Sequence, residues 1–67
     1  MHLQEAKNLC QELHDHFDGD WFKKEDAIAF IGEDGHLLMN YLHRHRVEDW
    51  QLAFWPLKNL FKITKIG

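Results

Sequence analysis

The chain has 67 residues, enough for one domain only, and 45% of them are hydrophobic. Its formal net charge of -3 argues mildly against a nucleic-acid partner, and its single cysteine excludes an internal disulfide and fits a reducing compartment. No apolar run approaches the roughly 20 residues of a membrane span. We therefore expect a single cytoplasmic domain, residues 1–67, that has no membrane partner.

Apolar residues recur at helical spacing near the N-terminus, and polar residues fill the positions between them. The apolar positions are Leu3, Ala6, Leu9, Cys10, Leu13 and Phe17. This pattern predicts an amphipathic helix with one buried face, on which the Cys10 thiol is inert. Gly19 is expected to end the helix, because glycine takes the positive φ of a helix terminus.

A second, shorter helix is expected after a brief aromatic step. Trp21 and Phe22 form that step, which is long enough for only one bridge of strand. The apolar face of the second helix consists of Ala27, Ile28, Phe30 and Ile31. Gly32 is expected to stop this helix.

A third helix follows the turn at residues 33–35, and Asp34 is its expected N-cap. We expect it to run to about His45. Its apolar face consists of Leu37, Leu38, Tyr41 and Leu42. The opposite, exposed side is expected to carry His36, Met39, Asn40 and His43.

The periodicity changes from helical to alternating near Trp50. Apolar residues then alternate along two segments, which are separated by Pro56-Leu57-Lys58-Asn59. This predicts two antiparallel strands joined by a loop of about four residues. Two strands alone would be only marginally stable, so the hairpin must pack on the helices. The predicted core residues are Leu9, Leu13, Ile28, Ile31, Leu38, Leu42, Leu52 and Phe61.

The predicted fold is α+β, with three helices and a C-terminal antiparallel hairpin. This order resembles the winged helix-turn-helix superfamily over about residues 3–65, through element order and apolar spacing. The resemblance implies a small winged-helix protein that binds DNA and regulates transcription. It also implies that the third helix enters the major groove and that the hairpin, or wing, contacts the backbone or minor groove. The alternative architecture is three helices with a loosely attached hairpin that dimerises through its edge.

Several polar side chains of the expected third helix and wing suit DNA. Asn can pair with adenine and Arg with guanine through two hydrogen bonds, while lysines can neutralise phosphates. The predicted DNA-binding residues are His36, Asn40, His43, Arg44, Arg46, Lys58, Asn59 and Lys62. The alternative is a solvated helix face, with lysines that protect a strand edge from pairing.

The charge distribution is consistent with a basic binding surface in the second half. Residues 1–43 carry three lysines and nine acidic residues, a balance of -6, and residues 44–67 carry five basic and two acidic residues, a balance of +3. Such an asymmetry can give a bipolar surface. Chance clustering on a solvated surface is the other explanation.

Trp55 supports a different class of function. It alternates away from Trp50, Leu52 and Phe54, so it is a candidate protein-contact residue on the hairpin. The domain would then be a protein-interaction module or inhibitor that uses the Trp55 region or the acidic first half and does not bind DNA. A homodimer is also left open.

We expect no enzyme, cofactor or metal site. The chain has no serine, so a Ser-His-acid triad is impossible. His14 and His16 are two residues apart, as are His43 and His45, and this spacing points each pair to different helix faces. A structural zinc site needs four converging ligands, which the spacing does not provide.

Overall fold

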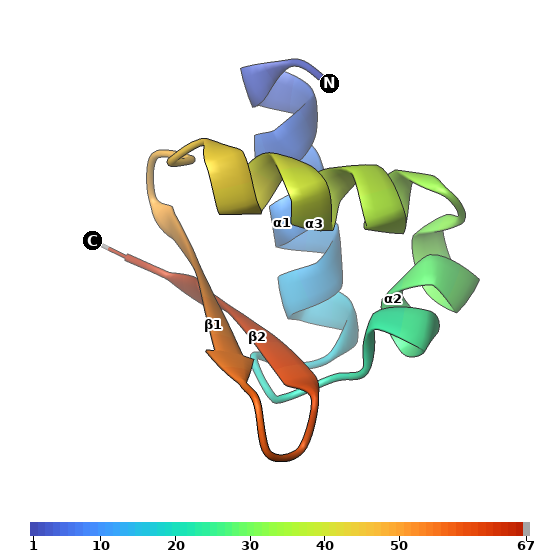
Figure 1. The fold of residues 1–67 in the computed structure, drawn as a ribbon. Coiled ribbons are helices and arrows are strands. Elements are labelled where there is room, and N and C mark those ends of the chain that lie inside the picture. The colour runs from blue at the N-terminus through green and yellow to red at the C-terminus, as the bar shows by residue number, and fades with distance from the viewer. Residues whose placement is uncertain (67) are drawn as a thin grey trace.

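The computed structural model describes residues 1–66 as a compact α+β domain with a radius of gyration of 10.6 Å. Three helices are followed by a C-terminal antiparallel hairpin, so the predicted fold class is confirmed (Figure 1). The elements are α1 Leu3–His16, α2 Lys24–Ile31, α3 Asp34–Arg44, β1 Trp50–Trp55 and β2 Leu60–Lys65. This is a winged-helix-like topology.

Helix α1 forms the back of the core, with α3 crossing in front of it (Figure 1). Its buried residues are Ala6, Leu9, Cys10 and Leu13. Leu3 shares the predicted apolar face but is exposed, because the first turn of α1 projects beyond α3. After the helix, Gly19 has a φ of 72°, which confirms its expected role at the helix end.

Helices α2 and α3 meet at a tight turn. Gly32 ends α2 with a φ of 75°, as predicted. Gly35 lies against α2 so closely that an added Cβ would sit 3.2 Å from the Cα of Ile28. The missing side chain therefore lets the start of α3 approach the α2 backbone.

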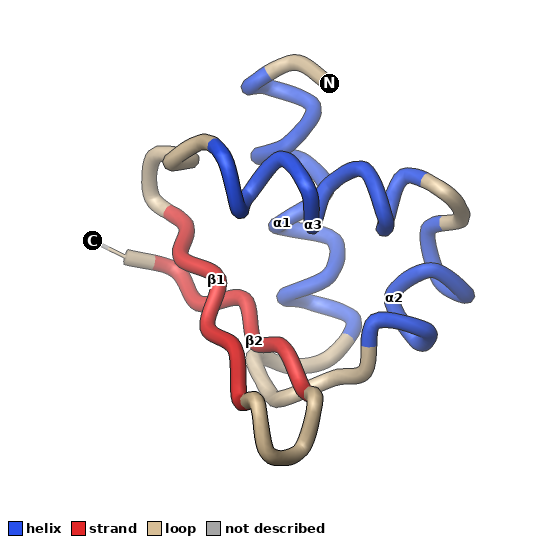
Figure 2. The backbone as a smooth tube through the Cα atoms, in the orientation of Figure 1, coloured by secondary structure: helices blue, strands red, loops and turns tan. Residues whose placement is uncertain are grey.

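The hairpin forms the third side of the core (Figure 2). Strand β1 pairs with β2 from Trp50↔Lys65 to Trp55↔Leu60, and the loop between the strands has four residues, as predicted. The aromatic step adds one antiparallel bridge, Phe22↔Phe61, held by N–H···O=C bonds of 2.7 and 2.8 Å. The inner face of the hairpin buries Trp50, Phe61 and Ile63. The hairpin is therefore part of the core and is not loosely attached.

Half of the predicted core residues are only partly buried. Leu9, Leu13, Leu38 and Phe61 are buried as expected. In contrast, Ile28, Ile31, Leu42 and Leu52 are intermediate in exposure, and the last three of these pack against the core from its rim. A domain of this size has a high ratio of surface to volume, so edge residues of each apolar stripe stay partly in water.

The predicted orientation of α3 is wrong by part of a turn. Met39, expected on the exposed side, is 1% exposed, whereas Leu37, expected in the apolar face, is 52% exposed. The buried arc of α3 instead consists of Gly35, Leu38 and Met39. Close packing at Gly35 brings this side of the helix toward α2 and the core, which draws Met39 inward.

Asp34 does not cap α3. It is the first helical residue, Glu33 holds the N-cap position, and no side-chain hydrogen bond caps the helix. Glu33 already has helical backbone angles, and only Gly32 and Glu33 lie between the end of α2 and the start of α3. The prediction failed because the turn between the two helices is shorter than the sequence pattern indicated.

Candidate nucleic-acid interface

The outer side of α3 carries a row of polar side chains. His36, Asn40 and His43 are all exposed, and their spacing of four and three residues places them along one stripe of the helix. Arg44 is exposed in the last turn, beside this stripe. Although Met39 is buried and not exposed as expected, the four predicted DNA-binding residues of α3 all lie at the surface.

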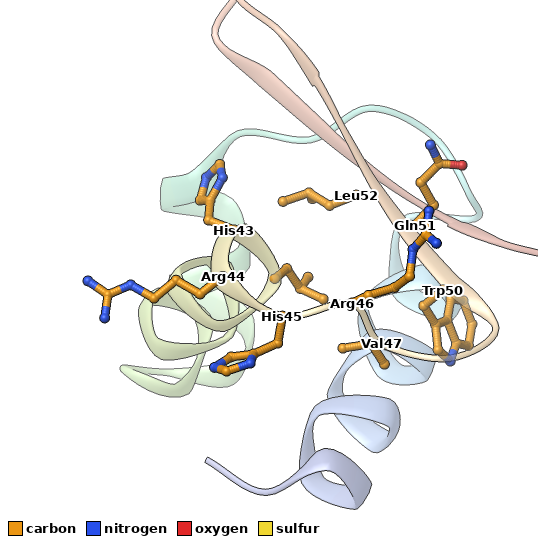
Figure 3. A pocket seen from close by; sticks show the side chains of 9 residues that line it. His43, Arg44, His45, Arg46, Val47, Trp50, Gln51 and Leu52 are labelled. Atoms are coloured by element: carbon orange, nitrogen blue, oxygen red, sulfur yellow. The ribbon is translucent and has the colours of Figure 1, made fainter.

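A basic hollow lies between the C-terminal end of α3 and the start of β1 (Figure 3). It has a volume of about 270 Å³, and none of its lining residues is acidic. The lining residues are Leu42, His43, Arg44, His45, Arg46, Val47, Trp50, Gln51 and Leu52. Figure 3 shows His43 and Arg44 pointing to different sides of α3, and Arg46 extending toward β1.

Local structure explains why these basic groups collect at this end of α3. The C-terminal end of a helix carries a partial negative charge, which favours basic residues such as His43 and Arg44 in the last turn. After the helix ends, the backbone becomes extended at His45 and turns back into β1. That turn brings Gln51 to the same hollow as Arg46.

The arginines of the hollow have no acidic partner within the described residues. In that part of the chain, Lys7 pairs with Glu48 at 3.6 Å, and a ring nitrogen of His14 lies 3.4 Å from a carboxylate oxygen of Asp15. Arg44 is therefore not neutralised by an ion pair in residues 1–66. An external anion would not have to displace an internal carboxylate from it.

The opposite end of α3 is acidic. Glu33 and Asp34 are exposed at its N-terminal end. As a result, the positive charge of α3 lies in its last turn, at Arg44, and at Arg46 just beyond it, instead of along its whole length, and the acidic Glu48 and Asp49 come next. An anionic partner would meet the C-terminal half of α3 more favourably than its start.

The wing residues form a second basic group, away from the hollow. Figure 1 shows the loop between β1 and β2 at the end of the hairpin farthest from the α3–β1 turn. Lys58 and Asn59 are exposed in this loop, whereas Lys62 in β2 is half-buried. His43, Arg44 and Arg46 thus line one hollow, with side chains that point in different directions, and they lie apart from the wing residues.

Two lysines of the wing each have their ammonium group near a tryptophan ring. The rings of Trp21 and Trp55 lie 5.5 Å apart between centroids and are tilted by 60°. The ammonium nitrogen of Lys58 lies 5.9 Å from the Trp55 ring, and that of Lys62 lies 5.5 Å from the Trp21 ring. Trp55 is 39% exposed. It is therefore a half-exposed aromatic side chain that packs on Trp21, next to basic groups.

Sequence reasoning missed the other two polar residues of the hollow, His45 and Gln51. The alternating run His43-Arg44-His45-Arg46 was a signal that could have identified His45. Gln51 offered no such signal, because its place depends on where the chain turns back after α3. Leu57 was predicted only as part of the loop between the two strands.

The thiol of Cys10 is removed from this surface. Cys10 is buried in α1, and burial raises the pKa of its thiol to about 12.

Residues 1–66 contain no group of three or more His, Cys, Asp or Glu side chains placed to hold a metal ion. Within the same residues, no helix is long and apolar enough to cross a membrane.

The exposed surface of α3 and the hollow offers positive charge, amide groups and imidazole rings. Such groups bind phosphate oxygens and the hydrogen-bonding edges of bases. No protein-family model, curated protein or solved structure matches the chain.

Proposed function

We propose that this protein is a DNA-binding domain of the winged helix-turn-helix superfamily that regulates transcription. In this proposal the exposed stripe of α3 lies in the major groove, where Asn40 and Arg44 contact base edges. His36 and His43 lie on the same stripe of α3 and would also face the major groove. The hairpin loop contacts the backbone or the minor groove through Lys58 and Asn59.

One observation carries this proposal: the basic hollow between α3 and β1. It adjoins the exposed α3 stripe, it is concave, and its lining includes two arginines, two histidines and no acid. Phosphate contacts fix the position of a protein on duplex DNA, while base contacts give specificity. Arg46 and Gln51 would hold phosphate oxygens beside the groove in which α3 lies.

The wing provides a second point of attachment. Lys58 and Lys62 each keep an ammonium group near a tryptophan ring, which limits the freedom of these long side chains. Since few basic groups face the DNA in one chain, the salt dependence of binding would be modest. Tight binding would then require a dimer or a partner protein.

The test is a titration of the pure protein with a mixed-sequence DNA duplex at low salt, followed by fluorescence anisotropy. We expect saturable binding that weakens as salt is added. Arg46→Ala should weaken binding severalfold. Lys7→Ala removes the same charge from α1, where Lys7 faces Glu48, and should leave the affinity unchanged.

A second candidate function is supported by Trp55, which is 39% exposed at the edge of the hairpin. Half-exposed tryptophans are frequent energetic centres of protein interfaces. The domain would then be an interaction module or inhibitor that does not bind DNA. Absence of DNA binding at low salt, together with a protein partner whose binding is lost in Trp55→Ala, would replace the DNA proposal with this one.

A further inference from the structure

Leu57 stands out at the apex of the hairpin loop. It is 93% exposed, more than any other large hydrophobic residue in the described part of the chain. Its side chain gives almost nothing to the core, since its area stays in water after folding. Loop tips usually carry polar residues or glycine. The core therefore gives no reason for a leucine at this position.

The backbone holds Leu57 in a defined place. Pro56 precedes it and fixes one backbone angle, and Asn59 closes the loop with a φ of 54°. The N–H of Lys58 donates to the carbonyl of Trp55 at 3.3 Å, and the N–H of Asn59 donates to that of Pro56 at 3.3 Å. Below the loop, six residue pairs join the strands. Leu57 therefore lies in a short loop that is held by backbone hydrogen bonds and by the paired strands below it.

The surroundings of Leu57 are basic. Residues 50–66 contain no acidic residue, and Lys62 in β2 is the next lysine after Lys58, whereas Lys65 pairs with Trp50 at the far end of the hairpin. Lys58 is the next residue in the chain, and the amide of Asn59 lies beyond it. An apolar tip with lysine and asparagine around it suits a surface that is anionic outside and apolar inside, and the minor groove of DNA has this character.

We propose that Leu57 is a wedge that enters the minor groove and inserts between two base pairs. The insertion partly unstacks one base step and bends the duplex, while Lys58 contacts a phosphate and Asn59 contacts an acceptor on the floor of the groove. This inference rests on the proposed DNA-binding function and adds a mechanical role to the wing. The same complex would therefore contain a bent DNA duplex.

The experiment uses a short mixed-sequence duplex that carries a donor dye at one end and an acceptor dye at the other. Binding is followed by anisotropy and bending by energy transfer, on the wild-type protein, Leu57→Ala and Ile66→Ala. Ile66 is a matched control, because it is also an exposed aliphatic residue of the basic C-terminal part and lies outside the loop. Circular dichroism checks that each variant is folded.

We expect the wild-type protein and Ile66→Ala to raise energy transfer at saturation. Leu57→Ala should still bind, within about tenfold of the wild-type affinity, and should lose the rise. Equal energy transfer in Leu57→Ala and wild type would overturn the wedge while leaving DNA binding intact. Absence of binding by all three proteins would instead overturn the DNA-binding function, and the wedge with it.

A membrane surface is the competing occupant of this tip, and a sedimentation assay with anionic lipid vesicles distinguishes the two. We expect no co-sedimentation with the vesicles. Vesicle binding that is lost in Leu57→Ala, with no bending of DNA by the wild-type protein, would assign the tip to lipid and overturn the wedge.

Discussion

The helical body and the C-terminal part of this domain share one core but differ in surface charge. Leu13 of α1 and Ile63 of β2 are both buried in the same cluster. In contrast, residues 1–43 carry a balance of -6, and residues 44–67 carry +3. Folding needs the shared core, but it does not require that acids and bases be separated, because a mixed surface keeps a domain soluble. A functional contact is one explanation of the separation, and the proposed DNA contact would supply it.

The difference also suggests how the protein is oriented on DNA. The acidic α1 and α2 and the acidic start of α3 would be repelled by phosphates, whereas the hollow and the wing would be attracted. The same charges that oppose binding at one side thus exclude wrong orientations. In the proposed complex, the helical body holds the fold together without contacting DNA. The surface formed by the end of α3 and the hairpin is the proposed DNA-binding surface.

The largest expected effect tests whether the core side of α1 is inaccessible to solvent and reagents. Because burial raises the pKa of the Cys10 thiol from about 9 to about 12, very little thiolate exists at pH 8. We expect alkylation of the folded protein to be about a thousandfold slower than that of the protein in denaturant. The measurement is the rate of iodoacetamide labelling under both conditions, and equal rates would show that α1 is open to solvent.

The direction of this pKa shift also sets a pH dependence of stability. The folded state keeps the thiol proton to a higher pH than the unfolded state does. The contribution of Cys10 to the free energy of unfolding is therefore fully present below about pH 9 and falls as the pH rises above it. Urea denaturation of wild type and Cys10→Ala between pH 8 and 11 should show the wild type losing more stability.

The next effect compares two leucines of α3. Leu38 is 0% exposed and Leu37 is 52% exposed. Leu38→Ala should lower the free energy of unfolding by about 2–5 kcal/mol, because it leaves a cavity in the core. Leu37→Ala should change it by less than about 1 kcal/mol. Urea denaturation measures both, and a loss below about 1 kcal/mol for Leu38→Ala would remove it from the core.

A smaller effect is expected on binding at the proposed DNA-binding surface. Arg44→Ala should weaken binding to a preferred DNA sequence by about 1–3 kcal/mol and relax the preference at one base position. Arg44 is exposed, so the free energy of unfolding should stay within about 0.5 kcal/mol of the wild type. Selection of bound sequences from a random pool checks this prediction. An unchanged sequence preference would mean that Arg44 contacts no base.

The smallest effect concerns the wing. Lys58→Ala should weaken binding to all sequences alike and lower the slope of log affinity against log salt by about one unit. The reason is that one phosphate contact, and the counterion it releases, is lost. Titrations at several salt concentrations measure the slope. An unchanged slope would show that Lys58 makes no phosphate contact.

Much of the fold follows from local patterns in the sequence. The change from helical to alternating period near Trp50 predicts the hairpin, and glycines at positions 19 and 32 mark helix ends. The rotation of α3 could not be predicted in the same way, because the row with Met39 and the row with Leu37 are both plausible apolar faces. Contact between Gly35 and the α2 backbone decides between them, and that contact exists only in three dimensions.

The candidate site was predictable in part, for a similar reason. His36, Asn40 and His43 follow from helical spacing alone, and they are exposed as expected. The hollow depends on the chain turning back after α3, which places Gln51 next to Arg46. The distance between the hollow and the wing loop depends on the direction of the hairpin, which periodicity does not specify.

The central claim is that DNA meets the end of α3 and the hairpin but not the acidic body. The most direct test follows the backbone amide signals of the labelled protein by NMR while a mixed-sequence duplex is added at low salt. We predict that the signals that move most belong to Asn40, Arg44, Arg46, Gln51 and Lys58, and that those of the outer face of α1 stay in place. Shifts centred on α1 and α2, or no shifts at all, would contradict the claim.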